Sequence, residues 1–495
     1  MKLEKLLTIV ARGCIHGNPA VEFSGLSTDS RTTGAGDLFV CVRGLTVDGH
    51  AFAPTAVEKG AVALVVEREL PLDVPQFVVP DARYAGALIA RQFYGNPSRQ
   101  MKVIGVTGTN GKTTTTMIIE RILEEAGFRT GLMGTVHLKI GNTVEAAKNT
   151  TADALTLQHT MRRMQEAKSD YCVMEVSSHA LDQGRVIGVD FRTAVFTNLT
   201  QDHLDYHVTM EAYAAAKGLF FARLGNAAEP GERGRKFAVL NVDDPAHKQY
   251  LALTAAEPIT YGIDRKADVR ATDLQLTAQG TRFTLHTFAG TTEVRLKLLG
   301  KFNIYNSLGA AAATLAEGIP LATVRAALER IPGVEGRVER VEAGQPFAVL
   351  VDYAHTPDGL MNVLDTVREF AAGRIITVFG CGGDRDRAKR PIMGKIAAER
   401  SGYTIVTSDN PRSESPESIL LEVEKGVIEA GSSTSDYELI ADRRMAIQKA
   451  VEMAKAEDVV LIAGKGHETY QIIGEAKLPF DDRAVAREAI RSVLG

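Results

Sequence analysis

Residues 103–114 read Val-Ile-Gly-Val-Thr-Gly-Thr-Asn-Gly-Lys-Thr-Thr, and this stretch decides the fold. Its apolar start predicts a buried strand, and the apolar positions after it predict a helix that ends near Gly127. A strand, a glycine-rich turn, Lys112 and a helix make up a phosphate-binding loop, in which backbone N–H groups face the anion. Val106 stands where the usual spacing has its first glycine, so the alternative is a plain glycine turn with an exposed lysine.

Length and composition bound the rest of the chain. A chain of 495 residues is too long for one core and predicts about three domains. We place them at residues 1–97, 98–332 and 333–495. The net charge of −4 argues against nucleic acid and membrane surfaces as partners. No run of about 18 apolar residues is present to insert into a bilayer, and the N-terminus lacks the apolar core of a signal peptide.

The four cysteines, Cys14, Cys41, Cys172 and Cys381, are scattered without paired spacing. We expect buried free thiols in a reducing cytosol, and neither disulfides nor a cysteine metal site. The predicted location is therefore cytoplasmic.

Apolar runs predict an α/β fold throughout. The first domain is a small α/β domain with a buried strand at residues 61–66 and an edge strand at residues 77–80. Central runs alternate with helical segments, which predicts a P-loop domain with a mostly parallel sheet, interrupted by antiparallel strands between residues 267 and 299. The last domain is predicted as a Rossmann-like, doubly wound unit. Its strands are expected at residues 348–352, 374–379, 403–407 and 459–463.

Polar residues follow two central strands. Glu175 ends one strand opposite the phosphate loop, which suits a magnesium ion, whereas the alternative is a solvated loop glutamate. Residues 198–207 contain two histidines and two aspartates. Zinc is conceivable there, but the spacing matches no zinc signature, and magnesium at an ATP site fits better. Lys217 lies on an otherwise apolar helix and by itself predicts a surface lysine with a buried stem.

Four polar loops follow strands of the last domain, at residues 352–357, 380–387, 409–412 and 464–468. Because parallel strands end at one edge of a sheet, we expect these loops to converge. Their arginines and carboxylates suit a zwitterionic ligand, whereas the alternative is four solvated turns. The sequence leaves open which of Arg385 and Arg387 faces the ligand.

Several motifs together resemble a known family. They are Gly-Thr-Asn-Gly-Lys-Thr at 108–113, Asn198 with Asp-His-Leu-Asp-Tyr-His at 202–207, Gly-Lys-Phe-Asn at 300–303 with Asn306, Gly-Arg at 336–337 and Asp-Tyr-Ala-His at 352–355. The set resembles the signature of the Mur ligases, the ATP-dependent amide-bond-forming enzymes of peptidoglycan precursor synthesis. The resemblance covers the whole chain.

Three further stretches, at residues 25–31, 149–151 and 409–412, resemble the branch that adds the third residue of the stem peptide. In that branch Asp-Asn-Pro-Arg accompanies meso-2,6-diaminopimelate, and forms without the arginine accompany L-lysine. The lysine-adding form, another amide ligase of the superfamily such as a folylpolyglutamate or cyanophycin synthetase, and a nucleotide-dependent switch remain alternatives. The resemblance implies that ATP phosphorylates the γ-carboxylate of D-glutamate and that the amine of diaminopimelate attacks the acyl phosphate.

The resemblance also implies roles for the matching positions. It implies that the substrate UDP-N-acetylmuramoyl-L-alanyl-D-glutamate is bound by Ser30, Asn149, Thr150, Thr151, Ser177, Gln183 and Arg185. It implies that ATP is bound by Gly108, Thr109, Asn110, Gly111, Lys112, Thr113 and Thr114, with Asn303, Arg337 and Asp352. It implies that diaminopimelate is bound by Arg385, Asp409, Asn410, Pro411, Arg412, Gly464 and Glu468.

The resemblance implies that magnesium ions are bound by Thr113, Glu175, His203 and Lys217. The implied catalytic residues are Lys112, Glu175, His203 and Lys217. Lys217 matches a lysine that the family carbamylates with carbon dioxide, which reverses its interpretation as a surface residue. The implied enzyme is a cytoplasmic, monomeric acid–amino-acid ligase of peptidoglycan synthesis, and so of cell-wall biogenesis, cell shape and cell division. Ala152 and Asp153 receive no role.

Overall fold

The computed structural model describes residues 1–44, 47–147, 149–225, 234–277, 280–334 and 336–494. The chain divides into two compact units. The first unit comprises Met1–Asp268 and Gly309–Pro320, and the second comprises Val269–Leu308 and Leu321–Gly495. The boundaries predicted at residues 97 and 332 stay a prediction.

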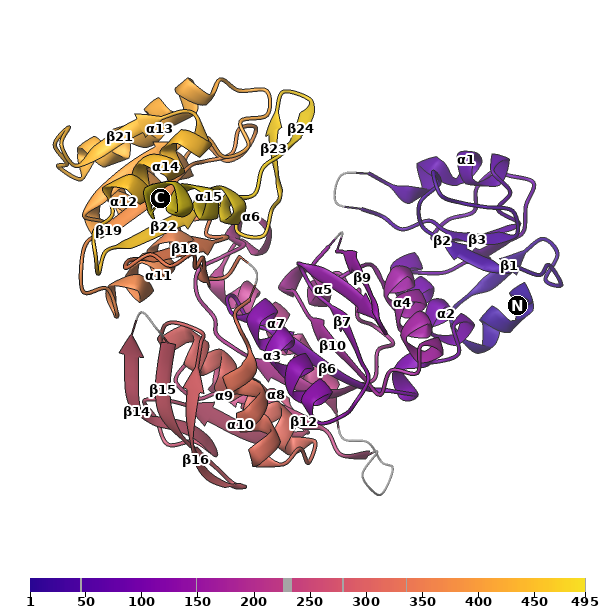
Figure 1. Cartoon of the computed structure of the whole chain (residues 1–495). Coiled ribbons are helices and arrows are strands. Elements are labelled where there is room, and N and C mark those ends of the chain that lie inside the picture. Colours follow the sequence, from indigo (N-terminus) through magenta and orange to yellow (C-terminus); the bar gives the residue numbers. More distant parts are fainter. Residues whose placement is uncertain (45–46, 148, 226–233, 278–279, 335, 495) are drawn as a thin grey trace. The chain divides into compact units, whose positions relative to one another are not determined.

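The first unit begins with a small sheet of strand order β1-β5-β4-β3-β2 (Figure 1). Its elements are η1 (Leu3–Thr8), β1 (Cys14–His16), β2 (Gly25–Ser27), β3 (Asp37–Val40), η2 (Gly49–Phe52), α1 (Ala53–Glu58), β4 (Ala63–Val66), β5 (Gln76–Val78), α2 (Ala82–Phe93) and η3 (Pro97–Arg99). Side chains alternate between two cores, so Leu38 and Val40 pack with α2 while Phe39 packs with α1. The prediction of an edge strand at residues 77–80 is wrong, because the short β1 pairs antiparallel with β5 and covers that edge.

The larger sheet of the first unit has the order β13-β12-β11-β6-β10-β7-β8-β9. Its strands are β6 (Lys102–Thr107), β7 (Thr130–Met133), β8 (His137–Ile140), β9 (Thr143–Ala146), β10 (Tyr171–Glu175), β11 (Phe191–Phe196), β12 (Phe237–Asn241) and β13 (Glu257–Gly262). Its helices are α3 (Lys112–Glu125), α4 (Ala154–Glu166), α5 (Ser178–Asp182), α6 (Leu204–His207), α7 (Met210–Leu224) and α8 (His247–Leu253).

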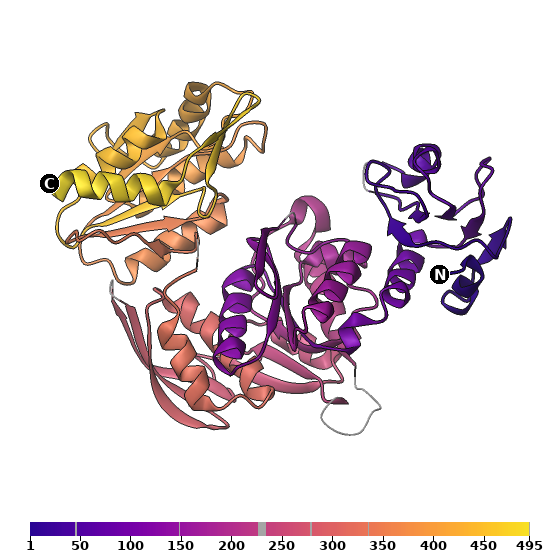
Figure 2. The ribbon, with the colours of Figure 1, turned by 45° about the vertical axis from the view of Figure 1, so that its right-hand side comes forward.

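Parallel pairing runs from β13 through to β7, and β8 and β9 add an antiparallel edge. Helices α4 and α7 share one core with alternate side chains of β6 and β10, namely Val103, Cys172 and Met174, and α3 lies against β6, β7 and β10. Figure 2 shows this sheet with helices on both faces. The predicted parallel sheet is confirmed, and its central strand β6 leads directly into the phosphate loop.

The second unit contains three antiparallel strands and a doubly wound sheet. Its first elements are β14 (Val269–Thr277), β15 (Gly280–Thr287), β16 (Gly290–Leu296), the first half of α9 (Lys301–Ala316) and α10 (Leu321–Arg330), because the boundary of the unit falls within α9 after Leu308. The sheet has the order β17-β18-β22-β19-β20-β21. The elements that build it are β17 (Glu339–Arg340), β18 (Ala348–Asp352), α11 (Pro357–Arg368), β19 (Ile375–Phe379), α12 (Lys389–Arg400), β20 (Tyr403–Thr407), α13 (Pro416–Glu429), β21 (Tyr437–Ile440), α14 (Arg443–Met453), β22 (Val459–Ala463), β23 (Tyr470–Ile473), β24 (Ala476–Pro479) and α15 (Asp482–Leu494).

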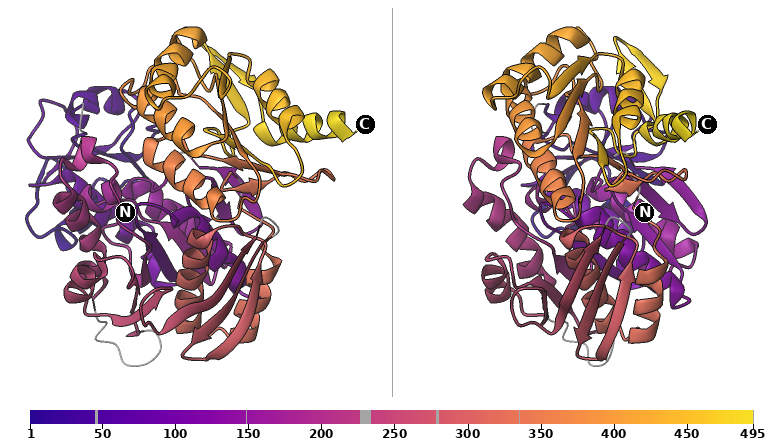
Figure 3. Two further views of the ribbon diagram at one scale, coloured as in Figure 1. Left: turned by 90° about the vertical axis from the view of Figure 1, so that its left-hand side faces the viewer. Right: turned by 60° about the vertical axis from the view of Figure 1, so that its left-hand side comes forward.

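Helices cover both faces of this second sheet. Helices α11, α12 and α13 share one core with it, and α14 and α15 share the other (Figure 3). Strands β18 to β21 are parallel, whereas β17 is antiparallel to β18. The predicted doubly wound unit is confirmed. The carboxyl ends of β18, β22, β19 and β20 therefore lie along one edge, where such folds bind ligands.

The cysteines confirm the expectation only in part. Cys41, Cys172 and Cys381 are buried free thiols, and burial raises the pKa of each to about 12. Cys14 is exposed, so the prediction of burial is wrong there, because β1 lies at the edge of its sheet. Among the described residues, no helix combines the length and apolar character needed to cross a bilayer.

Candidate active site

The phosphate loop joins β6 to α3 in the predicted strand–turn–helix form. Gly108 has φ of 152°, and a Cβ atom there would lie 1.9 Å from Thr197 Oγ1, so only glycine fits. The Nζ atom of Lys112 donates hydrogen bonds to the carbonyl oxygens of Gly108, at 2.9 Å, and Thr109, at 2.7 Å. The lysine thus folds back over the loop, where its charge faces the space that an anion would enter.

The end of the neighbouring strand β11 holds this loop in shape. Asn198 O accepts a hydrogen bond from the backbone N–H of Thr109 at 2.8 Å, and Asn198 Oδ1 accepts one from Asn110 N at 2.9 Å. Thr197 Oγ1 donates to Asn110 O at 2.6 Å. The loop is therefore anchored from a second strand before any ligand binds, which reduces the ordering that binding requires.

Lys217 is buried, so its interpretation as a surface lysine is wrong. Its side chain projects from α7 toward the phosphate loop, is 1% exposed, and donates a hydrogen bond of 2.9 Å to Gly108 O. The ammonium lies 4.4 Å from the centre of the Tyr213 ring. Burial holds the pKa of Lys217 well below its usual value, and the charge of Lys112 lowers this pKa further. A lysine in this environment gives up its proton far more readily than one in water.

Glu175 is the last residue of β10 and is 1% exposed, so the solvated-loop alternative is wrong. Its Oε1 accepts a hydrogen bond from Thr135 N at 2.7 Å, and its Oε2 accepts one from Thr135 Oγ1 at 3.1 Å. A Cβ atom on Gly134 would lie 2.6 Å from Glu175 Oε1, so the chain approaches the carboxylate closely. β10 pairs with β6 in a register that places Glu175 beside Val106, at the start of the phosphate loop.

His203 belongs to a group of aromatic side chains beside the loop. Its ring lies 4.8 Å from that of His179, and its Nε2 lies 3.3 Å from Asp202 Oδ2. Burial lowers the pKa of His203, and the positive charges of Lys112 and Lys217 act in the same direction. The side chain of Asp205 lies outside the described residues.

Part of the predicted metal set suits magnesium, which prefers oxygen ligands. Among the described residues, no three histidines, cysteines or acidic residues form a metal-binding group. Thr113 and Glu175 supply oxygen atoms, and both are buried. A carbamate on Lys217 would replace a cation by an anionic oxygen ligand, so the residues present fit magnesium once that lysine is modified.

A cavity of about 240 Å³ adjoins the predicted sugar-peptide residues. It is lined by Thr28, Val42, Arg83, Asn149, Asp153, Ala154, Leu155, Gln183 and Arg185. Arg185 donates hydrogen bonds to Gln183 Oε1 at 2.8 Å and to Thr151 O at 2.9 Å, so its guanidinium is fixed at the cavity wall. Ser177 caps α5 and accepts a hydrogen bond from Ala180 N at 3.2 Å. Thr150 Oγ1 lies 3.0 Å from Thr135 Oγ1, and Ser30 is buried but lies outside this lining.

Three predicted nucleotide residues belong to the second unit. Asn303 is 1% exposed, and its amide donates to Leu299 O at 2.9 Å. The Arg337 guanidinium lies 5.1 Å from the centre of the Tyr353 ring. Asp352 accepts backbone hydrogen bonds of 2.8 Å from Val338 and Ala354, and burial raises its pKa. Their part in the nucleotide site stays a prediction.

The four polar loops of the second unit meet at one edge of its sheet. Gly464 N donates to Asp352 O at 3.0 Å, and a Cβ atom on Gly464 would lie 2.6 Å from Asp409 Oδ2. Asn410 Nδ2 donates to Glu468 Oε2 at 3.1 Å. The predicted convergence is confirmed, and it brings carboxylates and amides together where a ligand ammonium could bind.

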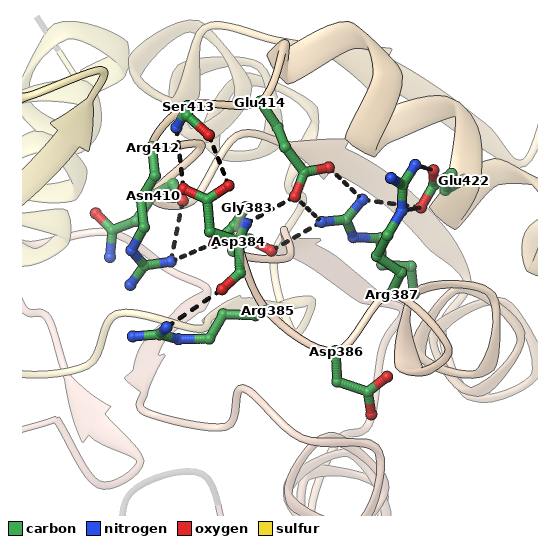
Figure 4. Close-up of polar contacts among 12 residues, drawn as sticks. Gly383, Asp384, Arg385, Asp386, Arg387, Asn410, Arg412, Ser413, Glu414 and Glu422 are labelled. Carbon is green, nitrogen blue, oxygen red and sulfur yellow. Dashed lines mark hydrogen bonds and ion pairs between the residues drawn. The ribbon is translucent and has the colours of Figure 1, made fainter. Parts of the chain in front are cut away.

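The structure distinguishes Arg385 from Arg387, which the sequence alone does not. Arg387 pairs with Glu422, with its Nε 3.4 Å from Glu422 Oε2. Arg385 donates instead to the carbonyl oxygen of Asp384 at 3.2 Å. Figure 4 shows the guanidinium of Arg385 on the side of Arg412, whereas that of Arg387 lies on the far side with Glu422. Arg385 is therefore the better candidate for a ligand carboxylate.

The chain matches three family models in succession. They are the Mur ligase family catalytic domain over residues 22–94, the Mur ligase middle domain over residues 106–314 and the glutamate ligase domain over residues 336–466. The chain belongs to the Mur ligase family. This membership agrees with the phosphate loop, the buried Lys217 and the converging loops described above.

Full-length relatives narrow the place of this Mur ligase within the family. A UDP-N-acetylmuramoyl-L-alanyl-D-glutamate–2,6-diaminopimelate ligase from Geobacillus thermodenitrificans is 54% identical over 493 residues, which are 99% of each chain. A solved structure of a ligase of the same name is 34% identical, covers 100% of this chain and 99% of that chain, and has a TM-score of 0.72. The MurF ligase from Thermotoga maritima, solved with ADP, is 20% identical with a TM-score of 0.62 over 95% of this chain and 96% of that chain, which shows a shared fold alone.

Several residues of this Mur ligase site were not predicted from the sequence. Lys465 is fully buried and donates to Asn410 Oδ1 at 3.2 Å and to Glu468 Oε2 at 3.3 Å. The sequence signal for Lys465 is its position in the polar loop at residues 464–468, which follows a predicted strand. Arg83 and Asp153 line the cavity, and Asp153 also caps α4 by accepting from Leu155 N at 3.0 Å. Of these two residues, only Asp153 has a sequence signal, because aspartate is a preferred residue before the first turn of a helix.

Proposed function

We propose that this Mur ligase adds meso-2,6-diaminopimelate to the γ-carboxylate of D-glutamate in UDP-N-acetylmuramoyl-L-alanyl-D-glutamate, with hydrolysis of ATP to ADP and phosphate. This is the reaction of class EC 6.3.2.13 in peptidoglycan synthesis. The observation that carries the proposal is the edge where Asp409, Asn410, Arg412, Gly464 and Glu468 meet. The full-length identity to ligases of that name supports it.

Phosphoryl transfer activates the acceptor. A carboxylate is a poor acyl donor, so its oxygen first attacks the γ-phosphorus of ATP, ADP leaves, and an acyl phosphate forms. Both reactants are anions, and the barrier is therefore lowered mainly by positioning and by positive charge. Lys112 supplies that charge, and we expect its ammonium to exchange the carbonyl oxygens of Gly108 and Thr109 for phosphate oxygens when ATP binds.

Amide formation follows without a further cofactor. The neutral amine of diaminopimelate attacks the acyl carbon, a tetrahedral intermediate forms, and inorganic phosphate leaves as the amide bond closes. The amine loses its proton during this step, which makes a nearby acceptor useful.

Lys217 would be carbamylated. Its neutral Nζ attacks carbon dioxide, an N–C bond forms, and a proton is released, so a cation becomes an anion. The lowered pKa supports this step because only the neutral amine is nucleophilic. Magnesium, when bound, would neutralise the charge of the phosphates, and Thr113, Glu175, His203 and the carbamate would hold it. The hydrogen bond from Lys217 to Gly108 O supports this role, because it brings Nζ beside the loop.

The zwitterionic substrate would bind by opposite charges. Arg412 and Arg385 would take the distal carboxylate, and Asp409, Asn410 and Glu468 would take the ammonium. L-Lysine lacks that carboxylate and would leave a half-buried guanidinium without its ligand partner, at a cost of several kcal/mol. The lysine-adding form is the second candidate, and the arginine at position 412 argues against it.

An assay of ADP release tests the proposal. The wild-type chain is given ATP, magnesium and the UDP-muramoyl dipeptide with diaminopimelate or L-lysine. Release that depends on diaminopimelate is expected, and release with lysine alone contradicts the specificity. ATP binding without turnover favours a nucleotide-dependent switch, and failure to bind the UDP-sugar favours another amide ligase. We also propose a cytoplasmic monomer with domains at residues 1–97, 98–332 and 333–495.

A further inference from the structure

We propose that Arg390 and Glu414 are positioning residues that lock together the two loops presenting Arg385 and Arg412 to the amino-acid substrate. The inference rests on the proposed function and extends it to residues outside the substrate contacts. The loops are residues 382–385, after β19, and residues 409–414, after β20; we call them the glycine loop and the arginine loop.

Arg390 lies at the start of α12 with a side chain that is 0% exposed. Its Nη1 and Nη2 donate to the two carboxylate oxygens of Glu414 at 2.9 and 2.8 Å, a bidentate contact. Nη2 also donates to Gly382 O at 3.2 Å. One buried guanidinium therefore grips a side chain of the arginine loop and the backbone of the glycine loop, and the planar fork suits both contacts.

Glu414 completes the connection from the opposite loop. Its Oε1 accepts a hydrogen bond of 2.7 Å from the backbone N–H of Asp384, next to Arg385. The guanidinium of Arg390 lowers the pKa of Glu414 to about 2, so the carboxylate is ionised throughout the physiological range. Figure 4 shows the carboxylate of Glu414 pointing toward Asp384. The carboxylate thus bridges the two loops at a constant charge.

The region held in this way is tightly fitted and strained. Gly383 N donates to Asn410 O at 2.9 Å, and a Cβ atom on Gly383 would lie 1.8 Å from Pro411 O. Asp384 and Arg412 have φ values of 54° and 52°, in the left-handed region that residues with a side chain rarely adopt. Such conformations persist only when surrounding contacts impose them. Releasing Glu414 would remove one of these contacts, and we expect Arg412 then to present its guanidinium less accurately to the substrate.

Glu422 provides a matched control on the same guanidinium. Its side chain comes from α13, accepts from Arg390 Nη1 at 2.8 Å and pairs with Arg387. Both of these partners lie outside the glycine loop and the arginine loop. Glu422→Gln therefore removes a carboxylate from Arg390 without touching either loop, whereas Glu414→Gln removes the charge and one of the two acceptor oxygens of the bridge.

The experiment measures KM and kcat for each substrate in full-length wild type, Glu414→Gln, Glu422→Gln and Arg390→Lys. We expect Glu414→Gln to raise KM for diaminopimelate by about tenfold or more, because small misplacements of binding groups have effects of this size. KM for ATP and for the UDP-muramoyl dipeptide should stay within about twofold, as should all constants of Glu422→Gln. Arg390→Lys, which keeps the charge but lacks the fork, should lie between wild type and Glu414→Gln.

The outcomes separate this inference from the proposed function. An unchanged KM for diaminopimelate in Glu414→Gln, an equal change in Glu422→Gln, or a parallel rise of KM for all three substrates overturns the inference alone. Absence of diaminopimelate-dependent turnover in the wild type overturns the proposed function and the inference together. If Glu414→Gln does not fold, the comparison of Arg390→Lys with Glu422→Gln decides in the same way.

Discussion

Replacing Arg412 by methionine tests how this Mur ligase selects its amino acid. The guanidinium is held from one end, since Nη1 donates to Gly383 O at 2.7 Å and reaches Asn410 O at 3.5 Å. Nε and Nη2 form the other edge of the fork, which matches the geometry of a carboxylate. Methionine keeps the apolar stem of the side chain but removes the guanidinium group and its charge.

The size of the effect follows from the hydrogen bonds that the substitution removes. A hydrogen bond to a charged group contributes about 1.5–3 kcal/mol, so the absence of a two-point interaction with the substrate carboxylate costs at least about 3 kcal/mol. At about 1.4 kcal/mol per factor of ten, this is a drop of roughly a hundredfold in kcat/KM for diaminopimelate. Turnover of L-lysine does not use this interaction, so the preference for diaminopimelate over lysine should fall by a similar factor.

The assay is ADP release at varied amino-acid concentration, with Arg387→Met as the matched control. Arg387 is exposed and paired with Glu422, so its replacement should change kcat/KM less than about threefold. An Arg412→Met enzyme as selective as wild type, or one no worse than Arg387→Met, would refute the assignment of the distal carboxylate to Arg412.

Three further predictions use other parts of the chain. Lys217→Ala should abolish turnover, and removing dissolved carbon dioxide should lower wild-type turnover until bicarbonate is restored. Because the carbamate needs a neutral amine, this loss of turnover should deepen as pH falls through the lowered pKa of Lys217. Wild-type turnover that does not respond to carbon dioxide at any pH contradicts the prediction. Gly464→Ala, at φ of 116° and with its Cβ atom 2.6 Å from Asp409 Oδ2, should raise KM for diaminopimelate about tenfold in the same assay, with KM for ATP as the internal control. Arg443→Met leaves Asp482, which is 0% exposed, without its bidentate partner at 2.7 and 2.8 Å, so the free energy of unfolding should fall by about 3–5 kcal/mol. The double variant Arg443→Met with Asp482→Leu should recover most of this loss in thermal unfolding. Equal losses in the single and the double variant would count against this explanation.

Local sequence patterns predicted most strands and the positions of the polar loops. Runs such as residues 237–241, 348–352 and 459–463 coincide with β12, β18 and β22 because a buried parallel strand is apolar on both faces. Where a strand lies at an edge, this signal weakens. The sequence therefore does not predict the short β1, and it predicts β5, which β1 covers, as the edge strand.

The sequence alone determined which chemical groups follow which strands, and with them the family. A glycine-rich turn before a lysine, or an arginine after Asp-Asn-Pro, is a local pattern, and parallel strands bring such loops to one edge. Only the tertiary structure decided the state of single polar side chains. Lys217 is buried with its Nζ against the carbonyl oxygen of Gly108, which is 109 positions away in the chain, and Arg387 is turned from the site because Glu422 holds it. Burial and pairing depend on segments that are distant in the chain. For the phosphate loop, folding brings a second lysine, Lys217, beside Lys112.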